Sequence, residues 1–442
     1  MIVKDGLVEI ERGGKRAIST KKDPLSKLKE LMGAYRQKPA PGLPPFQGGA
    51  SGLFCYDFAR YIEKFPDDRR PGGPELPEAF FFMADRLLAF DHLKKEAWII
   101  VCPGARQTGF GYGEPPALDW AQIHGESEEQ LALICERARK PAGPSAAFIG
   151  KEIKIEHEMS EGRYVSMVKR AKEYIAAGDI FQANLSLRVR AEIGWAEPWA
   201  IYSLLRGINP APFAAFMDFG DFFIAGSSPE RLVRLNAEVV ETRPIAGTRP
   251  RGKDREEDVA LRADLLLNEK EKAEHIMLID LERNDIGKVA DYGSIEVNEL
   301  MTTEDYSHVM HIVSNIRGRL AEGRDMFDCI RAAFPGGTIT GVPKVRCMEI
   351  INELEPVSRG PYTGSCGYFG FSGGMDMNIV IRTLLIKDGT AYVQAGAGIV
   401  ADSVPRREYR ESLKKAEALL LALRLAGGGG KNKKRKTARN GQ

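Results

Sequence analysis

The sequence predicts an α+β fold, and its hydrophobic pattern carries this prediction. Apolar, β-rich runs are separated by turn residues, Gly220-Asp221 in one case and Asp388-Gly389 in another. These predicted strands cover residues 213–219, 222–225, 379–386 and 391–394. Segments with apolar residues at helical spacing alternate with them. A chain of 442 residues with 43% hydrophobic content can bury a large core, as one large domain or two.

The N-terminal region, residues 1–138, is predicted to alternate strands with one helix. Its strand-like runs are residues 7–10 and 97–101. A helix over residues 24–35 is indicated by three apolar residues at helical spacing, Leu25, Leu28 and Leu31.

The rest of the chain is predicted to hold a linker, a main domain and a tail. Residues 139–150 are rich in Ala, Pro and Gly, so we expect a linker over 139–158. The main domain, 159–426, opens with an amphipathic helix that runs from Met159 to Gly178. Residues 427–442 begin with four glycines and are predicted to be a disordered basic tail.

Composition and charge exclude several classes of protein. No apolar run approaches the ~18 residues of a membrane span, and the first residues lack the layout of a signal peptide. Six cysteines without a CxxC pair indicate reduced thiols in the cytoplasm. The net charge of +2 includes six Lys and Arg in the last twelve residues, which hold no acid, so the body carries −4. The tail either contacts nucleic acid or an acidic surface or, as we expect, is solvated; no nucleic-acid or membrane partner is predicted.

Two pairs of glutamates, far apart in the sequence, are the strongest sign of a site. Glu271 and Glu274, and likewise Glu408 and Glu411, are spaced i,i+3 and therefore share one face of a helix. His275 follows the first pair directly, and Lys415 follows Glu411 by four residues. Two such helices facing each other would suit Mg²⁺ better than Zn²⁺. The alternative is a pair of solvated helix faces.

A series of Gly-rich motifs accompanies these glutamates. In order they are PIAGTRPRG (244–252), AEHIMLIDLERNDIGKV (273–289), YSHVMHIVSNIRG (306–318), FPGGTITGVPKVRCMEII (334–351), RGPYTGSCGYFGF (359–371), NIVIRTLL (378–385) and VQAGAGIVADS (393–403). The series resembles the chorismate-utilising enzymes, densely over residues 160–425 and more loosely over 1–140. This family includes component I of aminodeoxychorismate synthase and of anthranilate synthase, and the isochorismate and salicylate synthases.

The resemblance implies a large two-sheet sandwich with outer helices and an active site between its halves. It makes residues 1–138 the N-terminal part of the sandwich and 159–426 the chorismate-binding catalytic domain. Enzymes of this type usually carry a further N-terminal stretch with a leucine-rich segment, so we expect an N-terminally shortened fold. The alternative is a start codon that is placed internally.

The resemblance also implies a metal site and an anion site. Glu274 and Glu411 would hold Mg²⁺ directly, with Glu271 and Glu408 holding its waters. Chorismate is a dianion with an allylic 4-hydroxyl. Its binding is expected to involve a planar guanidinium, a phenol, the backbone of a Gly-rich turn and a lysine, which are Arg382, Tyr362, Gly396-Ala397-Gly398 and Lys415.

Catalysis is assigned by resemblance to His311, Glu271 and Lys415. His311, rather than His308, matches the functional histidine of the family; the alternative for either is a core histidine with a backbone partner. Arg382 could instead form a structural ion pair. Thr338 is expected near the substrate, although its loop could be a simple turn, and Ala246 lies where some relatives carry a nucleophilic lysine.

The branch of the family depends on where ammonia adds to the ring. Ala246 favours amination at C2, which gives anthranilate. Asn184 in FQANLSLR favours C4, as do the segments PYTGS (361–365), MNIVIRTL (377–384), 46–66 and SSPER (227–231). Asn184 and Thr363 are the polar residues expected to bias the approach of ammonia.

We therefore expect Mg²⁺-dependent amination of chorismate to 4-amino-4-deoxychorismate, as in aminodeoxychorismate synthase component I. Anthranilate synthase component I is the alternative. An isochorismate or salicylate synthase and a non-catalytic regulator are less favoured, the latter because the ligand residues are all present. No Cys-His-Glu glutaminase signature is found, so ammonia is expected from solution or from a separate amidotransferase subunit.

Overall fold

The structure is a computed structural model that describes residues 1–20, 22–64, 73–102, 119–141, 152–194, 196–306 and 309–428. Half of the predicted linker (142–151) and most of the predicted tail lie outside these ranges, as does His308. The domain boundaries therefore remain a prediction.

Two large antiparallel sheets dominate the described residues. The first has twelve strands, in the order β14 (Ile245–Pro250), β16 (Val309–Arg319), β13 (Val239–Arg243), β12 (Arg231–Asn236), β19 (Met375–Asn378), β18 (Ser365–Gly370), β4 (Gly49–Phe54), β5 (Ala79–Ala84), β1 (Ile2–Lys4), β2 (Leu7–Arg12) and β3 (Lys15–Thr20), with β15 (Glu296–Asp305) paired to β16.

The second sheet has seven strands in the part of the chain that is described. Their order is β10 (Phe213–Asp218), β11 (Phe222–Ser228), β20 (Thr383–Lys387), β21 (Thr390–Ile399), β9 (Gln182–Glu192) and β17 (Gly341–Val342), with β8 (Ile155–His157) paired to β9. Strands β6 (Arg86–Asp91) and β7 (Glu96–Val101) form a separate ribbon.

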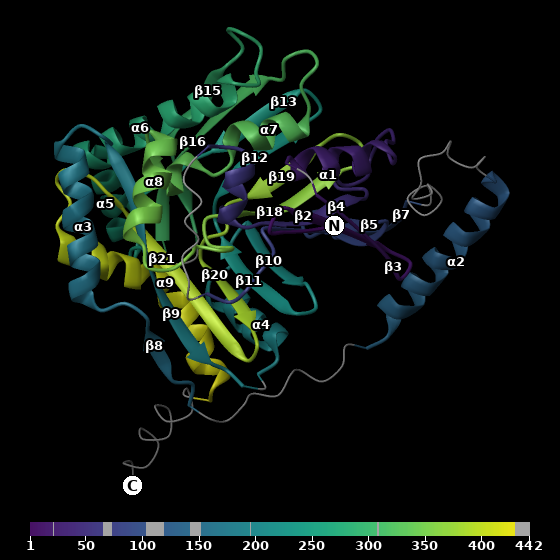
Figure 1. Ribbon diagram of the computed structural model, residues 1–442, viewed down its shortest axis with the longest axis horizontal. Coiled ribbons are helices and arrows are strands. Elements are labelled where there is room, and N and C mark those ends of the chain that lie inside the picture. Colours follow the sequence, from purple (N-terminus) through teal and green to yellow (C-terminus); the bar gives the residue numbers. More distant parts are fainter. Residues whose placement is uncertain are drawn as a thin grey trace.

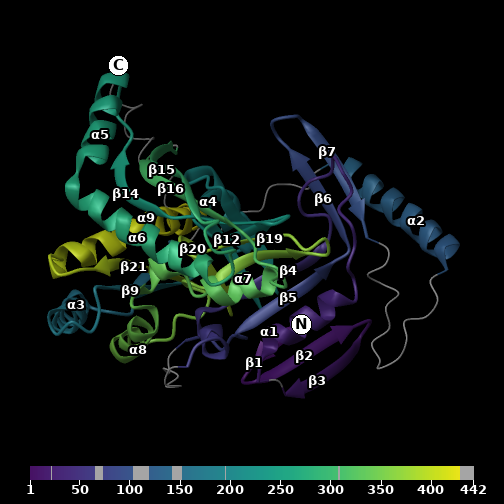
Figure 2. The same ribbon diagram turned by 90° about the horizontal axis from the view of Figure 1, so that it is seen from above.

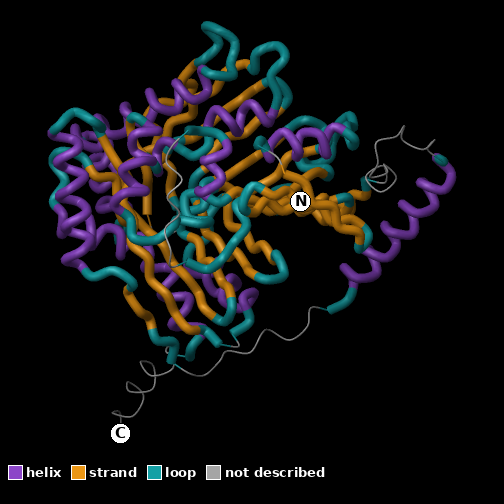
Figure 3. Tube along the Cα trace, in the orientation of Figure 1, coloured by secondary structure: helices purple, strands orange, loops and turns teal. Residues whose placement is uncertain are grey.

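Helices lie on the outer sides of the sheets (Figure 1, Figure 3). Against the second sheet pack α3 (Glu161–Ala176), α4 (Pro198–Ile208) and α9 (Pro405–Ala426). Against the first pack α5 (Arg255–Leu267), α6 (Glu269–Gly287) and α7 (Met326–Ala333), while α8 (Lys344–Leu354) packs on β9 and β17. Helix α1 (Pro24–Gly33) contacts α7, and α2 (Trp120–Arg139) lies along β7 at one end of the molecule (Figure 2).

Two short 3₁₀ turns, η1 (Tyr56–Tyr61) and η3 (Gly337–Ile339), complete the described elements. No helix in the described ranges has both the length and the apolar character to cross a bilayer. All six cysteines are described, and none is in a disulfide.

The core joins the two sheets. Each sheet has a buried apolar cluster of its own, and a third cluster draws Leu53 and Cys366 from the first sheet, Phe222 and Leu385 from the second, and Val380 from the chain between them. Burial of apolar surface on both inner faces is the main force that holds such a sandwich together. The predicted α+β class and two-sheet architecture are therefore confirmed.

One predicted strand is wrong at its start. Residues 379–386 were expected to be one strand, but β19 ends at Asn378 and β20 begins at Thr383. Between them the chain crosses from the first sheet to the second, and Arg382 takes a left-handed backbone with φ of +50°. The segment is rich in β-forming residues, as predicted, but it does not form one strand because the chain changes sheet within it.

The predicted hairpins and helices agree closely with the structure. Gly220 has φ of +87° between β10 and β11, and Asp388-Gly389 has φ of +48° and +69° between β20 and β21. Helix α3 is capped by Ser160, whose hydroxyl accepts a hydrogen bond from the N–H of Arg163. The chain turns away at Gly178, with φ of +82°.

Candidate active site

The candidate site lies where the chain crosses twice between the sheets. One crossing joins β11 to β12 and the other joins β19 to β20. Backbone hydrogen bonds hold the crossings together: the N–H of Ser227 donates to the carbonyl of Arg382 at 3.0 Å, and that of Ile379 to Glu230 at 3.0 Å. A third segment joins them, since Thr363 N–H donates to Val380 O at 2.8 Å. This ladder brings Glu230, Arg382 and the turn after Tyr362 into one region.

Arg382 is half-buried and has a guanidinium that is available to a ligand. Within the described residues its side chain makes no hydrogen bond and no ion pair. Burial lowers the pKa of Arg382, while Glu230 and Tyr306 act in the opposite direction. Arginine stays charged at any ordinary pH, so a buried anion is the partner that this group lacks. Among the described residues, Arg382 does not form the structural ion pair considered from the sequence.

Glu230 is a buried carboxyl that sequence reasoning missed. It is 6% exposed, and Oγ1 of Thr338 donates a hydrogen bond to its Oε1 at 2.9 Å. Burial raises the pKa of Glu230 to about 7, although Thr338, Arg382 and Lys415 lower it. Such a carboxyl can hold a proton at neutral pH and give it to a leaving group.

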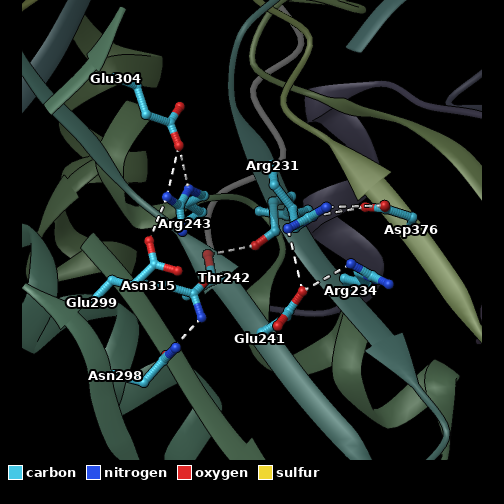
Figure 4. Close-up of polar contacts among 11 residues, drawn as sticks. Arg231, Arg234, Glu241, Thr242, Arg243, Asn298, Glu299, Glu304, Asn315 and Asp376 are labelled. Atoms are coloured by element: carbon cyan, nitrogen blue, oxygen red, sulfur yellow. Dashed lines mark hydrogen bonds and ion pairs between the residues drawn. The ribbon is translucent and has the colours of Figure 1, made fainter. Parts of the chain in front are cut away.

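The neighbouring Arg231 points elsewhere. Its guanidinium pairs with Asp376 at 3.0 Å and Glu241 at 3.4 Å, in a network that Arg234 joins (Figure 4). Of two neighbouring residues, Glu230 therefore belongs to the candidate site and Arg231 to a structural network.

His311 is buried and neutral. Its Nδ1 lies 3.0 Å from the carbonyl of Gly247 and 3.1 Å from Oγ1 of Thr248. Because a carbonyl can only accept, Nδ1 carries the proton, and Nε2, which has no partner in the described structure, is left as an acceptor. Burial, with a contribution from Arg382, lowers the pKa of His311 to about 4, although the hydrogen bond to Gly247 acts in the opposite direction.

Tyr306 supports this imidazole. The rings of Tyr306 and His311 meet edge to face with centroids 5.4 Å apart. The Tyr306 hydroxyl donates to Glu304 at 2.9 Å, and Glu304 is held by Arg243 at 2.7 Å (Figure 4). His311 is thus fixed from two sides.

The glycines of AGAG are in a strand, not in the predicted turn. Gly396 and Gly398 belong to β21 and lie opposite Ser186 and Asn184 of β9. The reason for glycine is space: a Cβ at Gly396 would lie 2.7 Å from Asn184 Oδ1 and 2.9 Å from Tyr362 Oη. A Cβ at Gly398 would lie 2.7 Å from Gln182 Nε2.

The free edge of β21 still offers backbone donors. Its pairing with β20 ends at Val393. The carbonyl of Gly396 accepts from Lys415 Nζ at 3.2 Å, so this residue points away from β9. In an extended strand the N–H of a residue points to the same side as its carbonyl, and alternate residues share that side. The N–H groups of Gly396 and Gly398 are therefore turned outward.

Other predicted substrate residues lie around these groups. Tyr362 is 9% exposed, and burial raises its pKa. The hydroxyl of Thr338 donates its hydrogen bond to Glu230. Ala246 lies in β14 opposite Ile312, directly before Gly247. Thr363 is not available to ammonia, because its hydroxyl donates to Tyr362 O at 2.6 Å and accepts from Arg359 at 3.1 Å.

The two glutamate pairs lie on α6 and α9 and influence each other. Burial raises the pKa of Glu274, which Lys270 lowers and which Glu271 and Glu411 raise. Burial also raises the pKa of Glu408, and Glu411 contributes in the same direction. Solvated helix faces alone do not explain this mutual repulsion.

Each pair also has cationic neighbours. Glu271 pairs with Arg249 at 3.2 Å, Glu274 with Lys270 at 3.6 Å and Glu411 with Lys415 at 2.9 Å. His275 turns away from them, and its Nε2 lies 2.7 Å from Ser314 Oγ. Nowhere in the described ranges do three or more His, Cys, Asp or Glu side chains converge as ligands of one ion.

Comparison with known proteins agrees with this architecture. The family described as chorismate binding enzyme matches residues 4–421. Aminodeoxychorismate synthase component 1 of Bacillus subtilis is 45% identical over 429 residues, 96% of this chain and 87% of that protein. Anthranilate synthase component 1 of Acetivibrio thermocellus is 46% identical over 416 residues, 92% of this chain and 81% of that protein. The chain belongs to the chorismate-binding enzymes.

A solved member of the family has the same fold. The crystal structure of anthranilate synthase component I from Streptococcus pneumoniae is similar to this chain with a TM-score of 0.78 and 35% identity. The similarity covers 95% of this chain and 91% of that one. The two relatives from different branches are about equally identical, so overall similarity does not separate the branches.

Chorismate-binding enzymes generally use Mg²⁺, and the residues present fit this ion. Carboxylate oxygens are the ligand type that Mg²⁺ prefers, and Glu411 on α9 is close enough to Glu274 on α6 to raise its pKa. The raised pKa of Glu274 and of Glu408 indicates a half-buried excess of negative charge that a divalent cation would relieve. Glu271, Glu274, Glu408 and Glu411 are the residues that would hold it.

A cavity of about 400 Å³ lies beside this site rather than in it. Tyr362 lines it, together with Arg359 and Gln394, but Arg382, Glu230 and the four glutamates do not. The charged groups with unmet partners, and not the volume of this cavity, therefore identify the substrate site.

Proposed function

We propose that this chain aminates chorismate at C4 to give 4-amino-4-deoxychorismate. The observation that carries the proposal is the position of Arg382, whose guanidinium has no partner in the described structure, beside a buried Glu230 with a pKa of about 7. A cation for a carboxylate and an acid for a leaving hydroxyl are the two groups that chorismate requires.

Each residue has a defined task in this reaction. The Arg382 guanidinium binds one substrate carboxylate with two parallel hydrogen bonds. Glu230 gives its proton to the 4-hydroxyl, the C4–O bond breaks and water leaves. Ammonia forms the C4–N bond, and its surplus proton returns to the Glu230 carboxylate. Neutral His311 accepts a hydrogen bond through Nε2 from the reacting ring.

Mg²⁺, when bound, would neutralise the ring carboxylate and favour electron withdrawal from the diene. Glu274 and Glu411 are proposed as its direct ligands, with Glu271 and Glu408 holding its waters. Lys415, between Glu411 and Gly396, balances this negative charge and fixes the free edge of β21.

Asn184 supports amination at C4. Its Oδ1 is buried without a hydrogen-bond partner and lies beside the space above Gly396, near Tyr362 Oη. An unpaired buried acceptor is costly, so a donor such as ammonia fits this position. The alternative is anthranilate synthesis, which Ala246 favours because alanine cannot form the adduct at C2 that lysine forms in some relatives.

Ammonia is proposed to come from a separate glutamine amidotransferase subunit, because similar proteins carry the designation component 1. The cytoplasm is the proposed location. Residues 159–426 are proposed as the catalytic domain, preceded by the N-terminal part of the sandwich.

Product analysis tests the proposal. The purified protein is incubated with chorismate, Mg²⁺ and ammonium at high pH, with and without a lyase that releases 4-aminobenzoate from aminodeoxychorismate. We expect 4-aminobenzoate only when the lyase is present. Anthranilate, which fluoresces directly, as the main product would replace this function by the alternative.

A further inference from the structure

Arg359 lies in the motif RGPYTGSCGYFGF but takes no part in the chemistry proposed above. Its side chain is 2% exposed and is paired with the equally buried Glu355 through two contacts, at 2.8 and 3.0 Å. A buried ion pair is weak support for stability, because desolvation of both charges offsets most of their attraction. Its contacts therefore require another explanation.

The remaining donors of Arg359 reach three separate segments. Nη2 donates to the carbonyl of Asn184 at 2.6 Å, and Nη1 donates to the carbonyl of Ile339 at 3.1 Å. Nη1 also donates to Oγ1 of Thr363 at 3.1 Å. Each of these residues is, or directly adjoins, a group of the candidate site: Asn184 itself, Thr338 and Tyr362.

The ring contacts and the partner carboxylate extend the same arrangement. The guanidinium lies over the ring of Tyr362, 5.6 Å from its centroid, and over that of Tyr56 at 4.8 Å. Oε1 of Glu355 accepts hydrogen bonds from both the N–H and the hydroxyl of Ser186, each at 2.8 Å. Gln394 of β21 also donates to that hydroxyl at 2.8 Å.

We propose that Arg359 is a positioning residue that fixes β9 at Asn184, the η3 turn at Thr338 and the Tyr362 turn relative to one another. Asn184 and Tyr362 border the space above Gly396, and Thr338 donates to Glu230. None of the three is near another in the sequence. One planar guanidinium with five donors is suited to hold three acceptors and a carboxylate at once. The inference rests on the proposed function in one respect, since the site is taken to bind chorismate.

The test uses Arg359→Lys in the full-length chain. Lysine keeps the charge beside Glu355 but cannot reach the carbonyls of Asn184 and Ile339 together. We expect kcat/KM for chorismate to fall on the order of tenfold to a hundredfold, because small displacements of positioning groups have effects of this size. Arg188→Lys is the matched control. Arg188 lies on β9, the strand that carries Asn184, and is also buried and paired with a carboxylate, that of Glu158.

Hydrogen exchange separates positioning from general stability. The N–H of Asn184 donates to Thr340 O at 3.0 Å, and that of Ser186 donates to Glu355. Arg359→Lys should accelerate exchange at these two amides while amides of the first sheet keep their wild-type rates. Arg188→Lys should leave both amides and kcat/KM near wild type.

Two results would overturn the inference. One is unchanged kcat/KM in Arg359→Lys; the other is exchange that rises uniformly over the whole chain. If Arg359→Lys does not fold, Glu355→Gln replaces it under the same criteria, since it removes the charge that holds the guanidinium. If the wild type does not consume chorismate, the proposed function fails, whereas the exchange pattern still decides whether Arg359 fixes these segments.

Discussion

Replacing Glu230 by glutamine should abolish turnover and yet stabilise the protein at alkaline pH. Glutamine has the same shape and can still accept the hydrogen bond from Thr338, but it has no acidic proton. Loss of a general acid typically lowers kcat about 10²- to 10⁴-fold. A purely structural carboxyl would not combine this loss with a gain in stability.

The gain in stability follows from the pKa of Glu230. Burial raises this pKa from 4.5 to about 7. Because the folded protein holds this proton more tightly than the unfolded chain does, Glu230 costs no stability below the unfolded pKa. Stability is lost as the pH rises from the unfolded pKa through the folded pKa. The difference between these two pKa values corresponds to about 3 kcal/mol, by which ionisation of Glu230 above pH 7 destabilises the folded wild type.

Urea unfolding at two pH values measures this effect. At pH 8.5, Glu230→Gln should be more stable than the wild type by about 3 kcal/mol, and at pH 5 the difference should shrink to below about 1 kcal/mol. Circular dichroism follows the transition, and chorismate consumption is measured on the same preparations. A variant that is active, or that is less stable than the wild type at pH 8.5, would refute the role given to Glu230.

Three further substitutions test other parts of the site. Arg382→Lys should raise the KM for chorismate about 10- to 150-fold, because a point charge cannot replace a bidentate contact worth about 1.5–3 kcal/mol; an unchanged KM in steady-state assays would return Arg382 to a structural role. Glu274→Gln and Glu411→Gln should each abolish turnover at sub-saturating Mg²⁺ with an unchanged circular dichroism spectrum, while the exposed Glu269→Gln on the same helix should not; near-normal rates in the first two would exclude them as metal ligands. Gly396→Ala should lose chorismate binding by calorimetry, since its Cβ would lie 2.5 Å from the backbone carbonyl of Leu185, whereas Gly398→Ala should be milder because it meets the flexible end of Gln182; equal affinities in both would contradict the account of the strand.

The sequence predicted the groups that carry their own local pattern. The glutamate pairs were noticed from their i,i+3 spacing and assigned to a metal site through the motifs that accompany them, and the hairpin turns were predicted from Gly and Asp between apolar runs. Arg382, Tyr362 and His311 were found through ordered motifs that resemble those of a family. These features depend on residues close to one another in the chain.

The sequence could not predict features that depend on distant pairing. Gly396 and Gly398 resemble a turn until β9, about 200 residues earlier, pairs with them. The break at Arg382 arises because β19 and β20 belong to different sheets. Glu230 becomes an acid only because the fold buries it, which raises its pKa against the opposing effects of Thr338 and Arg382, and its neighbours in the sequence give no sign of this burial.

The most direct test of the central claim follows the nitrogen atom itself. Chorismate, Mg²⁺ and ¹⁵N-labelled ammonium are incubated with the protein, and the products are examined by NMR. The account predicts consumption of chorismate with ¹⁵N bonded to ring carbon C4. A product with ¹⁵N at C2 would contradict the proposed regiochemistry, and consumption of chorismate without any ¹⁵N in the product would contradict amination altogether.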